Sequence, residues 1–390
     1  MLFDCGLKIH SDSNFPMAPP EKPDAVVVSH AHLDHTGFLP SLFKHGSHPE
    51  LICTPPTLAM GEVIVRDSLD IMERRGEHPY QVGHVKAMLE SARLLSFNKK
   101  RAIGESELTM YCAGHIPGAA ICDLQTPEGR LVYTGDFKGE ETKTTFATDA
   151  PPKGPDAMII ESTYADLDHP PRKGLEAELG RQVRETLENG GSVLLPAFAI
   201  GRTQELMRIV RSENRDVDIW IDGMGWKVSE ILSRHSAYMK DFKRFRHDMG
   251  TCRHVMHKKE RERVLRKPCV VISTAGMLQG GPALRYLLEM GPESKAIFTG
   301  YCVEDTNGHN LLNKGFAEYD GVKIKPKATY SYLDFSAHAG RSELFELAKK
   351  VSPQKIYCVH GDSCEEFADE LRLEGFDAYA PKLGETVKVK

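Results

Sequence analysis

The 390-residue sequence predicts an α/β fold. Short apolar runs rich in Val, Ile and Leu alternate with longer segments whose apolar residues recur at helical spacing, which is typical of strand–helix units. Several of these runs end directly on His, Asp or Glu, the position where active sites collect in α/β sheets. At roughly 150 residues per domain, the length indicates two or three domains, each able to bury a core.

Composition excludes several classes of protein. The net charge of −5, from 50 Lys and Arg against 55 Asp and Glu, excludes a uniformly basic nucleic-acid coat protein but not a local basic groove. No run approaches the ~18 apolar residues of a membrane span, and the first residues do not resemble a signal peptide. Nine Cys without a C-x-x-C pair favour a reducing compartment. We therefore expect a cytoplasmic protein without membrane contact.

The first 170 residues combine strands with two helical segments. Apolar spacing predicts helices over 57–75 and 82–95. The turn residues at 126–129 (Thr-Pro-Glu-Gly) predict that the strands on either side form a hairpin. Short apolar runs predict strands over 25–29, 51–53, 108–112, 119–124, 131–134 and 157–160.

From about residue 175 the chain alternates regularly between helices and strands, which predicts a parallel sheet over 190–300. Helices are predicted over 175–187, 202–210, 342–350 and 363–373. Strands are predicted over 192–195, 217–221, 269–273, 296–299, 328–332 and 355–359. No low-complexity linker interrupts the chain, so the middle segment is expected to be a compact insertion in a domain built from both chain ends.

The densest group of candidate metal ligands is the run from His30 to His35, with the sequence H-A-H-L-D-H. It follows an apolar strand and precedes a helix expected to begin near residues 36–37. Imidazole and carboxylate together suit Zn²⁺, Mn²⁺ or Fe, and the absence of Cys from the motif disfavours a closed structural zinc site. The spacing serves two adjacent ions better than one. The alternative is a cluster of surface histidines. The apolar strand directly before the motif disfavours it.

Four further candidates stand directly after apolar strands. Taken singly, each is better interpreted as a capping Asp or a satisfied core His, but their common placement favours one shared site. They are Asp4, His115, Asp136 and His360.

Taken in order, these motifs resemble those of the metallo-β-lactamase-fold nucleases of the β-CASP family, in particular the short archaeal form of the cleavage and polyadenylation specificity factor. The β-CASP acidic residue matches Glu161 in I-E-S-T-Y, and its later histidines match His338 in F-S-A-H-A and His360 in V-H-G-D. Other similar segments are 196–202, 273–278 and 298–301.

The resemblance covers nearly the whole chain and implies a metallo-β-lactamase αββα sandwich with an inserted β-CASP α/β domain, a parallel sheet flanked by helices. It implies the first part of the metallo-β-lactamase domain over 1–170, the β-CASP domain over 171–327, and the C-terminal, RNA-metabolising part over 328–390. Family members usually carry two strands before the aspartate strand, whereas this sequence begins on it.

The resemblance further implies two zinc ions bridged by Asp136. The ligands of the first would be His30, His32, His115 and Asp136. The ligands of the second would be Asp34, His35, Asp136 and His360. Asp4 would orient His35 by accepting its other ring N–H.

The implied chemistry is hydrolysis of RNA by a hydroxide that two metal ions activate, which leaves a 5′-phosphate and a 3′-hydroxyl. His338 would protonate the leaving oxygen, Glu161 would keep His338 cationic, and Asp34 is expected to serve catalysis as well as metal binding. The alternative to a catalytic role is that His338 is a packed histidine at the start of a helix and that Glu161 caps a turn.

Single-stranded RNA is the expected partner, and a homodimer is common in the resembled family. Segment 234–267 carries twelve Lys and Arg against four Asp and Glu, an excess that fits phosphate contact or, equally, a partner subunit. A Gly-bearing turn after residue 273 is able to present N–H groups to a phosphate, although it is alternatively a plain turn. The expected RNA contacts are Arg202, Lys258, Lys259, Ser273, Thr274 and Gly276.

The leading hypothesis is therefore a zinc-dependent ribonuclease of RNA processing or decay, with endonuclease and 5′-to-3′ exonuclease action both open. A small-molecule hydrolase on the same fold is a second hypothesis, but it would not need Glu161, His338 or His360. An inactive RNA-binding subunit is a third. Such relatives lose metal ligands, whereas every matched position is filled here.

Overall fold

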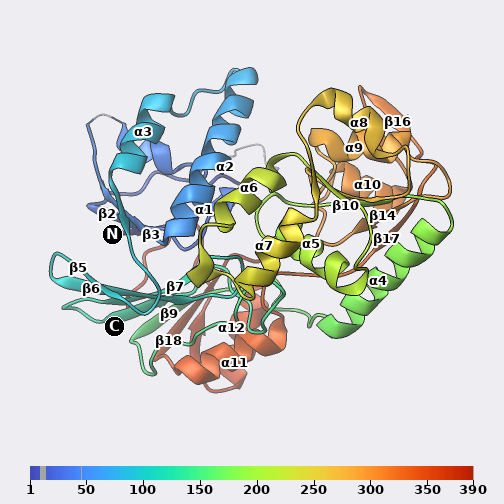
Figure 1. The fold of residues 1–390 in the computed structure, drawn as a ribbon. Coiled ribbons are helices and arrows are strands. Elements are labelled where there is room, and N and C mark those ends of the chain that lie inside the picture. The colour runs from blue at the N-terminus through green and yellow to red at the C-terminus, as the bar shows by residue number, and fades with distance from the viewer. Residues whose placement is uncertain (9–14, 45, 390) are drawn as a thin grey trace. The chain divides into compact units, whose positions relative to one another are not determined.

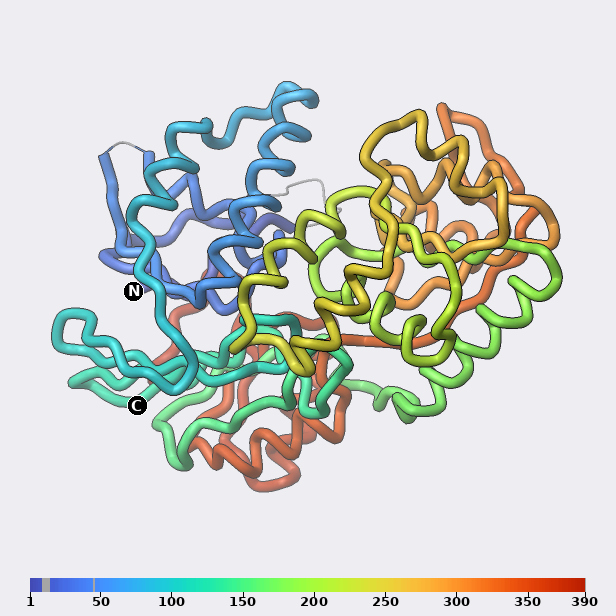
Figure 2. The backbone as a smooth tube through the Cα atoms, in the orientation of Figure 1, coloured from blue at the N-terminus to red at the C-terminus, as the bar shows by residue number. Residues whose placement is uncertain are grey.

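A computed structural model describes residues 1–8, 15–44 and 46–389 of the chain. The backbone divides into two compact units (Figures 1 and 2). Unit 1 consists of Met1–Asp168 and Ala337–Lys390, and unit 2 is formed by the residues between these two segments, His169–Ser336.

Unit 1 is a domain built from both chain ends, because β18 (Lys355–Val359) of the second segment pairs with β9 (Ala157–Glu161) of the first. The second crossing between the units falls later in the sequence than expected. Residues 328–336 lie in unit 2 because strand β17 (Thr329–Tyr332) pairs in parallel with β14 (Lys295–Phe298) of the unit 2 sheet.

Unit 1 contains two sheets that pack face to face. The first is entirely parallel, in the order β1-β2-β3-β4, and the second has the order β19-β18-β9-β8-β7-β6-β5. The strands of the first sheet are β1 (Leu2–Phe3), β2 (Ala25–Val27), β3 (Glu50–Cys53) and β4 (Ala92–Leu94). Those of the second are β5 (Lys100–Ile103), β6 (Ser106–Cys112), β7 (Ala120–Gln125), β8 (Arg130–Tyr133), β9 (Ala157–Glu161), β18 (Lys355–Val359) and β19 (Asp377–Tyr379).

Alternating side chains along β2 explain why the two sheets pack together. Ala25 and Val27 belong to a buried apolar cluster with Leu108 and Met110 of the opposite sheet. Val26, which points to the other face, belongs to a separate cluster with the residues of the covering helices. Successive residues of a strand point to opposite faces, so a fully apolar strand has both faces covered.

Helices cover the outer face of each sheet (Figure 1). The first sheet is covered by α1 (Leu33–Thr36), α2 (Pro55–Arg74) and α3 (Val82–Glu90), and the second by α11 (Arg341–Val351) and α12 (Cys364–Leu373). A short 3-10 helix (Leu39–Phe43) follows α1. The result is the αββα sandwich that the sequence predicts.

Unit 2 is built on one six-stranded sheet in which every strand pair is parallel, in the order β12-β11-β13-β10-β14-β17. This confirms the parallel sheet predicted over 190–300. Its other strands are β10 (Val193–Pro196), β11 (Ile219–Asp222), β12 (Arg253–Val255) and β13 (Val270–Ser273), with a separate hairpin of β15 (Ala317–Tyr319) and β16 (Val322–Ile324). Its helices are α4 (Arg172–Glu188), α5 (Arg202–Glu213), α6 (Met224–Leu232), α7 (Phe242–Gly250), α8 (Lys258–Val264), α9 (Gly281–Glu289) and α10 (Asn307–Lys314), with a 3-10 turn at Ser236–Tyr238.

The predicted hairpin is confirmed, but two predicted helices have wrong limits. Strands β7 and β8 pair antiparallel across the turn at 126–129. The helix predicted over 82–95 ends at Glu90, because residues 92–94 form strand β4 and pair with β3. The spacing of apolar residues in the sequence does not reveal these backbone hydrogen bonds. The helix predicted to begin near 36–37 is instead the single turn α1, and Pro40 in the next segment prevents its continuation.

Candidate metal centre

The candidate ligands follow the ends of neighbouring strands in unit 1. Asp136 follows β8, Glu161 is the last residue of β9, and His360 follows β18. These three strands are adjacent and parallel, so their carboxyl ends meet at one edge of the second sheet. His30 follows β2 of the first sheet, and His115 lies in the connection between β6 and β7. Residues from five places in the sequence thus reach one site.

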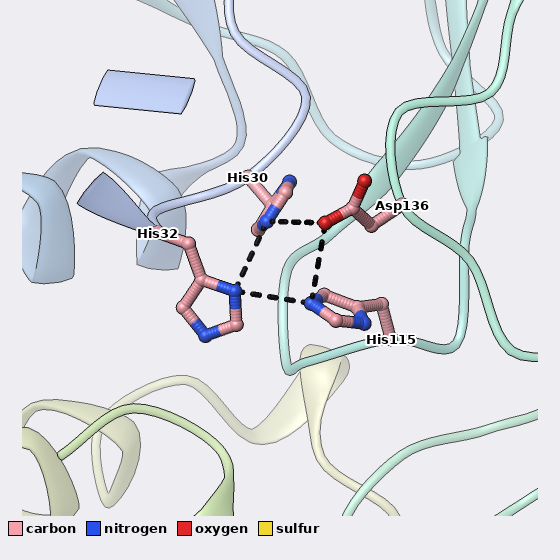
Figure 3. A group of neighbouring side chains, drawn as sticks. All are labelled: His30, His32, His115 and Asp136. Atoms are coloured by element: carbon pink, nitrogen blue, oxygen red, sulfur yellow. Dashed lines mark hydrogen bonds and ion pairs between the residues drawn. The ribbon is translucent and has the colours of Figure 1, made fainter. Parts of the chain in front are cut away.

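Four of these residues form the first donor group, in which three imidazoles and one carboxylate face one another (Figure 3). The Nδ1 atom of His32 lies 3.1 Å from Nε2 of His30 and 3.0 Å from Nε2 of His115. Asp136 completes the group, with Oδ2 at 3.5 Å from His30 Nε2 and 3.8 Å from His115 Nε2. All four donor atoms lie within 4.8 Å of one another.

The histidines of the first group are held neutral. Burial lowers the pKa of His30 and of His115 well below the usual value, and it lowers the pKa of His32 as well. The Nδ1 atom of His115 lies 2.8 Å from the carbonyl oxygen of Ala337, to which it donates, so Nε2 carries the lone pair that faces the group. A neutral imidazole is the form that binds a metal ion.

Asp34, His35 and His360 form a second donor group beside the first. His35 Nε2 lies 4.0 Å from Asp34 Oδ2, and His360 Nε2 lies 3.6 Å from that same oxygen. Asp136 faces this group too, with Oδ2 at 3.4 Å from His35 Nε2 and Oδ1 at 3.8 Å from His360 Nδ1. One buried carboxylate therefore contacts both groups.

Two buried atoms of this region make no hydrogen bond within the described part of the chain: His35 Nε2 and Asp136 Oδ1. A buried polar atom without a partner is costly, so such atoms mark a place for a group from outside the chain. The Asp136 carboxylate raises the pKa of His360 to about 9 against the opposing effect of burial. A site negative enough to favour a cationic imidazole also favours a metal cation, and the nitrogen and oxygen donors fit Zn²⁺.

Asp4 holds His35 from behind the second group. Its Oδ2 atom lies 2.7 Å from His35 Nδ1 and also accepts hydrogen bonds from the hydroxyls of Tyr133, at 2.7 Å, and Ser29, at 2.6 Å. The backbone N–H of Ser29 donates to the other oxygen at 2.7 Å. With its Nδ1–H directed to Asp4, the His35 ring turns Nε2 toward Asp136.

His338 and Glu161 form a pair at the edge of the donor groups. His338 Nδ1 lies 2.9 Å from Glu161 Oε2 and 3.8 Å from Asp136 Oδ2. Burial by itself lowers the pKa of His338, but the Glu161 and Asp136 carboxylates outweigh it, and the pKa is raised. Glu161 is fixed by Phe137, whose backbone N–H donates to Oε1 at 2.8 Å.

Three stretches of the chain match known domain families. Residues 1–177 match the metallo-beta-lactamase superfamily, residues 203–311 the Beta-Casp domain, and residues 321–381 the Zn-dependent metallo-hydrolase RNA specificity domain. The chain is 33% identical to "Probable RNase MJ4" of Methanocaldococcus jannaschii, over all of this chain and 94% of that protein. The chain belongs to the β-CASP ribonuclease family of the metallo-β-lactamase superfamily.

Two other relatives of this β-CASP chain carry different names. "RNase aCSPSF2" of Saccharolobus solfataricus is 32% identical over 96% of this chain and 77% of its own length. "Transcription termination factor FttA" of Methanocaldococcus jannaschii is 33% identical over all of this chain and 68% of its own length. The family predicted from the motifs is confirmed. None of the helices in the described ranges is both long and apolar enough to cross a bilayer.

The RNA contacts predicted for this β-CASP protein all lie in unit 2. Arg202 begins α5, Ser273 ends β13 with Thr274 and Gly276 in the loop that follows, and the exposed Lys258 and Lys259 begin α8.

Part of the basic segment 234–267 is neutralised within unit 2. Arg261 makes a two-pronged ion pair with the buried Asp222, at 2.6 and 2.9 Å. Arg244 pairs with the buried Asp248 at 2.8 Å. The Arg261 pair ties α8 to β11, and the Arg244 pair lies within α7 itself, so the two pairs balance part of the positive charge of the segment inside unit 2.

The sequence analysis did not single out three hydroxyl-bearing residues that this β-CASP site uses. Ser29 and Tyr133 bind Asp4, and Thr163 lies between Glu161 and His360. A single hydroxyl residue is too common to stand out in a sequence. The available signal was proximity, because each of the three lies within three residues of a candidate site residue.

Proposed function

We propose that the chain is a zinc-dependent ribonuclease that holds two zinc ions in unit 1 and cleaves RNA phosphodiesters in RNA processing or decay. The observation that carries the proposal is the position of Asp136, whose carboxylate contacts two adjacent donor groups while the His338–Glu161 pair lies beside it. Two adjacent metal sites with a nearby proton donor are an arrangement that supports phosphodiester hydrolysis.

The donor sets support two zinc ions. His30, His32, His115 and Asp136 would hold the first, and Asp34, His35, Asp136 and His360 the second. When bound, such a pair lowers the pKa of a water molecule toward neutrality and offsets the charge on phosphate oxygens.

Within the chain, His338 is the proposed general acid. The raised pKa favours the protonated form of its imidazole. A proton donor at this position lets the 3′ oxygen of the upstream fragment leave as a hydroxyl, while the downstream fragment keeps a 5′-phosphate. Glu161 accepts the Nδ1–H and so directs Nε2 away from itself, toward the reacting phosphate. A placed general acid contributes roughly 10²–10⁴-fold in rate.

Asp34 is proposed to serve both metal binding and catalysis. The side chains of Asp34 and His360 are each 36% exposed, whereas the side chain of His35, the third member of the second donor group, is 3% exposed. The His360 ring outweighs the effect of burial and lowers the pKa of Asp34, so the carboxylate stays ionised at neutral pH.

RNA as the substrate is supported by the names of the relatives and by the match of residues 321–381 to an RNA specificity domain. Phosphate contact by the exposed Lys258 and Lys259 and by the loop after β13 remains part of the proposal. Endonuclease and 5′-to-3′ exonuclease action are both compatible with this chemistry.

The test is to incubate the purified protein with single-stranded RNA labelled at one end and, in parallel, with circular RNA. We expect cleavage that a chelator abolishes, products with a 5′-phosphate, and about two zinc ions per chain. His338→Ala is expected to lose roughly 10²–10⁴-fold in rate while keeping its zinc. Opening of circular RNA identifies endonuclease action.

Three outcomes would refute the proposal. Full activity of the His338→Ala protein removes the assigned general acid. Turnover of a thioester or lactam without RNA cleavage indicates a small-molecule hydrolase. RNA binding without metal indicates an inactive subunit of a processing complex.

A further inference from the structure

Thr163, two residues after the end of β9, contacts both the proposed proton-donor pair and the second donor group. Its hydroxyl oxygen lies 2.6 Å from Glu161 Oε2, 3.2 Å from His360 Nδ1 and 3.1 Å from the His360 carbonyl oxygen. We propose that Thr163 is a positioning residue that selects the metal-binding nitrogen of His360. This inference rests on one part of the proposed function, namely that a metal ion binds to the second donor group.

A count of hydrogens determines the direction of these bonds. A threonine hydroxyl has one hydrogen and two lone pairs. Glu161 is a carboxylate that accepts from Phe137 N and faces His338 Nδ1, so it has no hydrogen of its own to give. At 2.6 Å the Thr163 hydrogen must lie on the line to Glu161 Oε2, because two oxygen lone pairs at that distance repel.

The Thr163 oxygen is then left as an acceptor toward His360. A ring nitrogen at 3.2 Å bonds to this oxygen only if it carries a hydrogen, so the hydrogen of the neutral His360 ring is on Nδ1. The lone pair is therefore on Nε2, the atom that lies 3.6 Å from Asp34 Oδ2 in the second donor group. In the opposite tautomer, Nε2 would carry a hydrogen and could not bind a metal ion.

The backbone around His360 is held independently of the Thr163 side chain. Ser162 N donates to the His360 carbonyl oxygen at 3.2 Å, and strand β18 pairs with β9 up to Val359 and Glu161. A Cβ atom on Gly361 would lie 2.1 Å from the Ser162 carbonyl oxygen, so these two loops are in close backbone contact. Loss of the hydroxyl frees the ring without unfolding the loop.

The experiment compares Thr163→Val, which keeps the shape and loses the hydroxyl, with Thr163→Ser, which keeps the hydroxyl. Thr186→Val is the matched control, because Thr186 is a buried threonine of unit 2 whose hydroxyl donates to the Gln182 carbonyl oxygen at 2.8 Å. Zinc affinity of the two sites is measured by chelator competition, and the His360 ring nitrogens are observed by ¹⁵N NMR in the zinc-loaded protein.

We expect Thr163→Val to weaken the second zinc ion by roughly 10–100-fold, the usual effect of losing a hydrogen bond that orients a ligand, and to leave the first unchanged. Thr163→Ser should bind as the wild type does, and the wild-type His360 spectrum should show a hydrogen on Nδ1. Unchanged affinity in Thr163→Val, equal weakening of both ions, or failure of Thr163→Ser to restore binding would overturn the inference.

These measurements do not use RNA. A protein that binds two zinc ions as described but cleaves no RNA would refute the proposed function and leave the role of Thr163 intact. If the Thr163→Val variant keeps the second zinc ion and cleaves RNA normally, the role of Thr163 is refuted and the proposed function is left intact.

Discussion

Protonation in the site is decided residue by residue, by whether burial or a facing carboxylate dominates. His30 and His115 are buried among other imidazoles, and burial lowers the pKa of each. His338 is less enclosed, with 22% of its side chain exposed, and the carboxylates of Glu161 and Asp136 raise its pKa. The same side chain is therefore suited to be a neutral ligand in two places, and in the proposed mechanism it is the proton donor in a third.

Replacement of Glu161 by Gln tests this assignment through the pH profile. A raised pKa means that His338 keeps its proton to higher pH, and activity falls as the pH rises through that value. Glu161→Gln removes the charge that raises the pKa, so we expect the alkaline limb of the kcat profile to move to lower pH. The exposed Glu178→Gln serves as the control. An unmoved alkaline limb in Glu161→Gln would mean that another group sets it.

At the scale of elements, the first metal-binding motif depends on a close approach between two backbone segments. Residues 5–7 pair with α1 through bonds from Cys5 N to the His35 carbonyl oxygen, at 2.9 Å, and from Leu7 N to the Leu33 carbonyl oxygen, at 3.1 Å. Between them, a Cβ atom on Gly6 would lie 1.7 Å from the carbonyl oxygen of Asp34. Only glycine fits there, and its absence of a side chain lets α1 hold Asp34 and His35 in the site.

We expect Gly6→Ala to push α1 away, to cost about 1–3 kcal/mol in the free energy of unfolding, and to weaken the second zinc ion. Gly83→Ala is the control, because Gly83 lies in α3 with open space around its Cβ position and alanine is favoured in a helix by up to about 1 kcal/mol. Urea denaturation and zinc titration measure both effects. Equal stability of the two variants would contradict the close contact.

The elements predicted correctly from the sequence are those whose own residues are buried. Strands β10 and β13 are buried at every residue, and their limits agree with the predicted ones within a residue or two. Strands β5 and β12 lie at sheet edges, expose Lys and Arg side chains, and carry no apolar run, so their pairing comes from the neighbouring strand rather than from their own composition. The candidate metal ligands could be predicted because several of them lie close together in the sequence and follow apolar strands. The contacts of the Thr163 hydroxyl with Glu161 and His360 exist only in the folded chain, so the sequence does not reveal them.

At the scale of the molecule, the two units have separate hydrophobic cores. The clusters under both sheets of unit 1 contain no residue of unit 2, and the large cluster beneath β13 and β14 contains none of unit 1. All the candidate metal ligands belong to unit 1. Both tryptophans of the chain, Trp220 and Trp226, belong to unit 2, so their fluorescence reports on that unit alone.

Removal of metal is therefore expected to destabilise one unit. Because a ligand stabilises the folded state that binds it, a chelator should lower the temperature of one calorimetric transition and leave the tryptophan transition unchanged. An equal shift of the tryptophan signal would show that metal binding stabilises unit 2 as well. The expected homodimer stays a prediction that light scattering checks.

One buried carboxylate, Asp136, is proposed to serve two metal ions. Metal analysis of the purified protein and of Asp136→Asn tests it most directly. We predict about two zinc ions per chain in the wild type and the loss of both sites' tight binding in Asp136→Asn, because Asp136 contacts both donor groups. A wild-type chain that retains one metal ion or none, or an Asp136→Asn chain that retains two, would contradict the account.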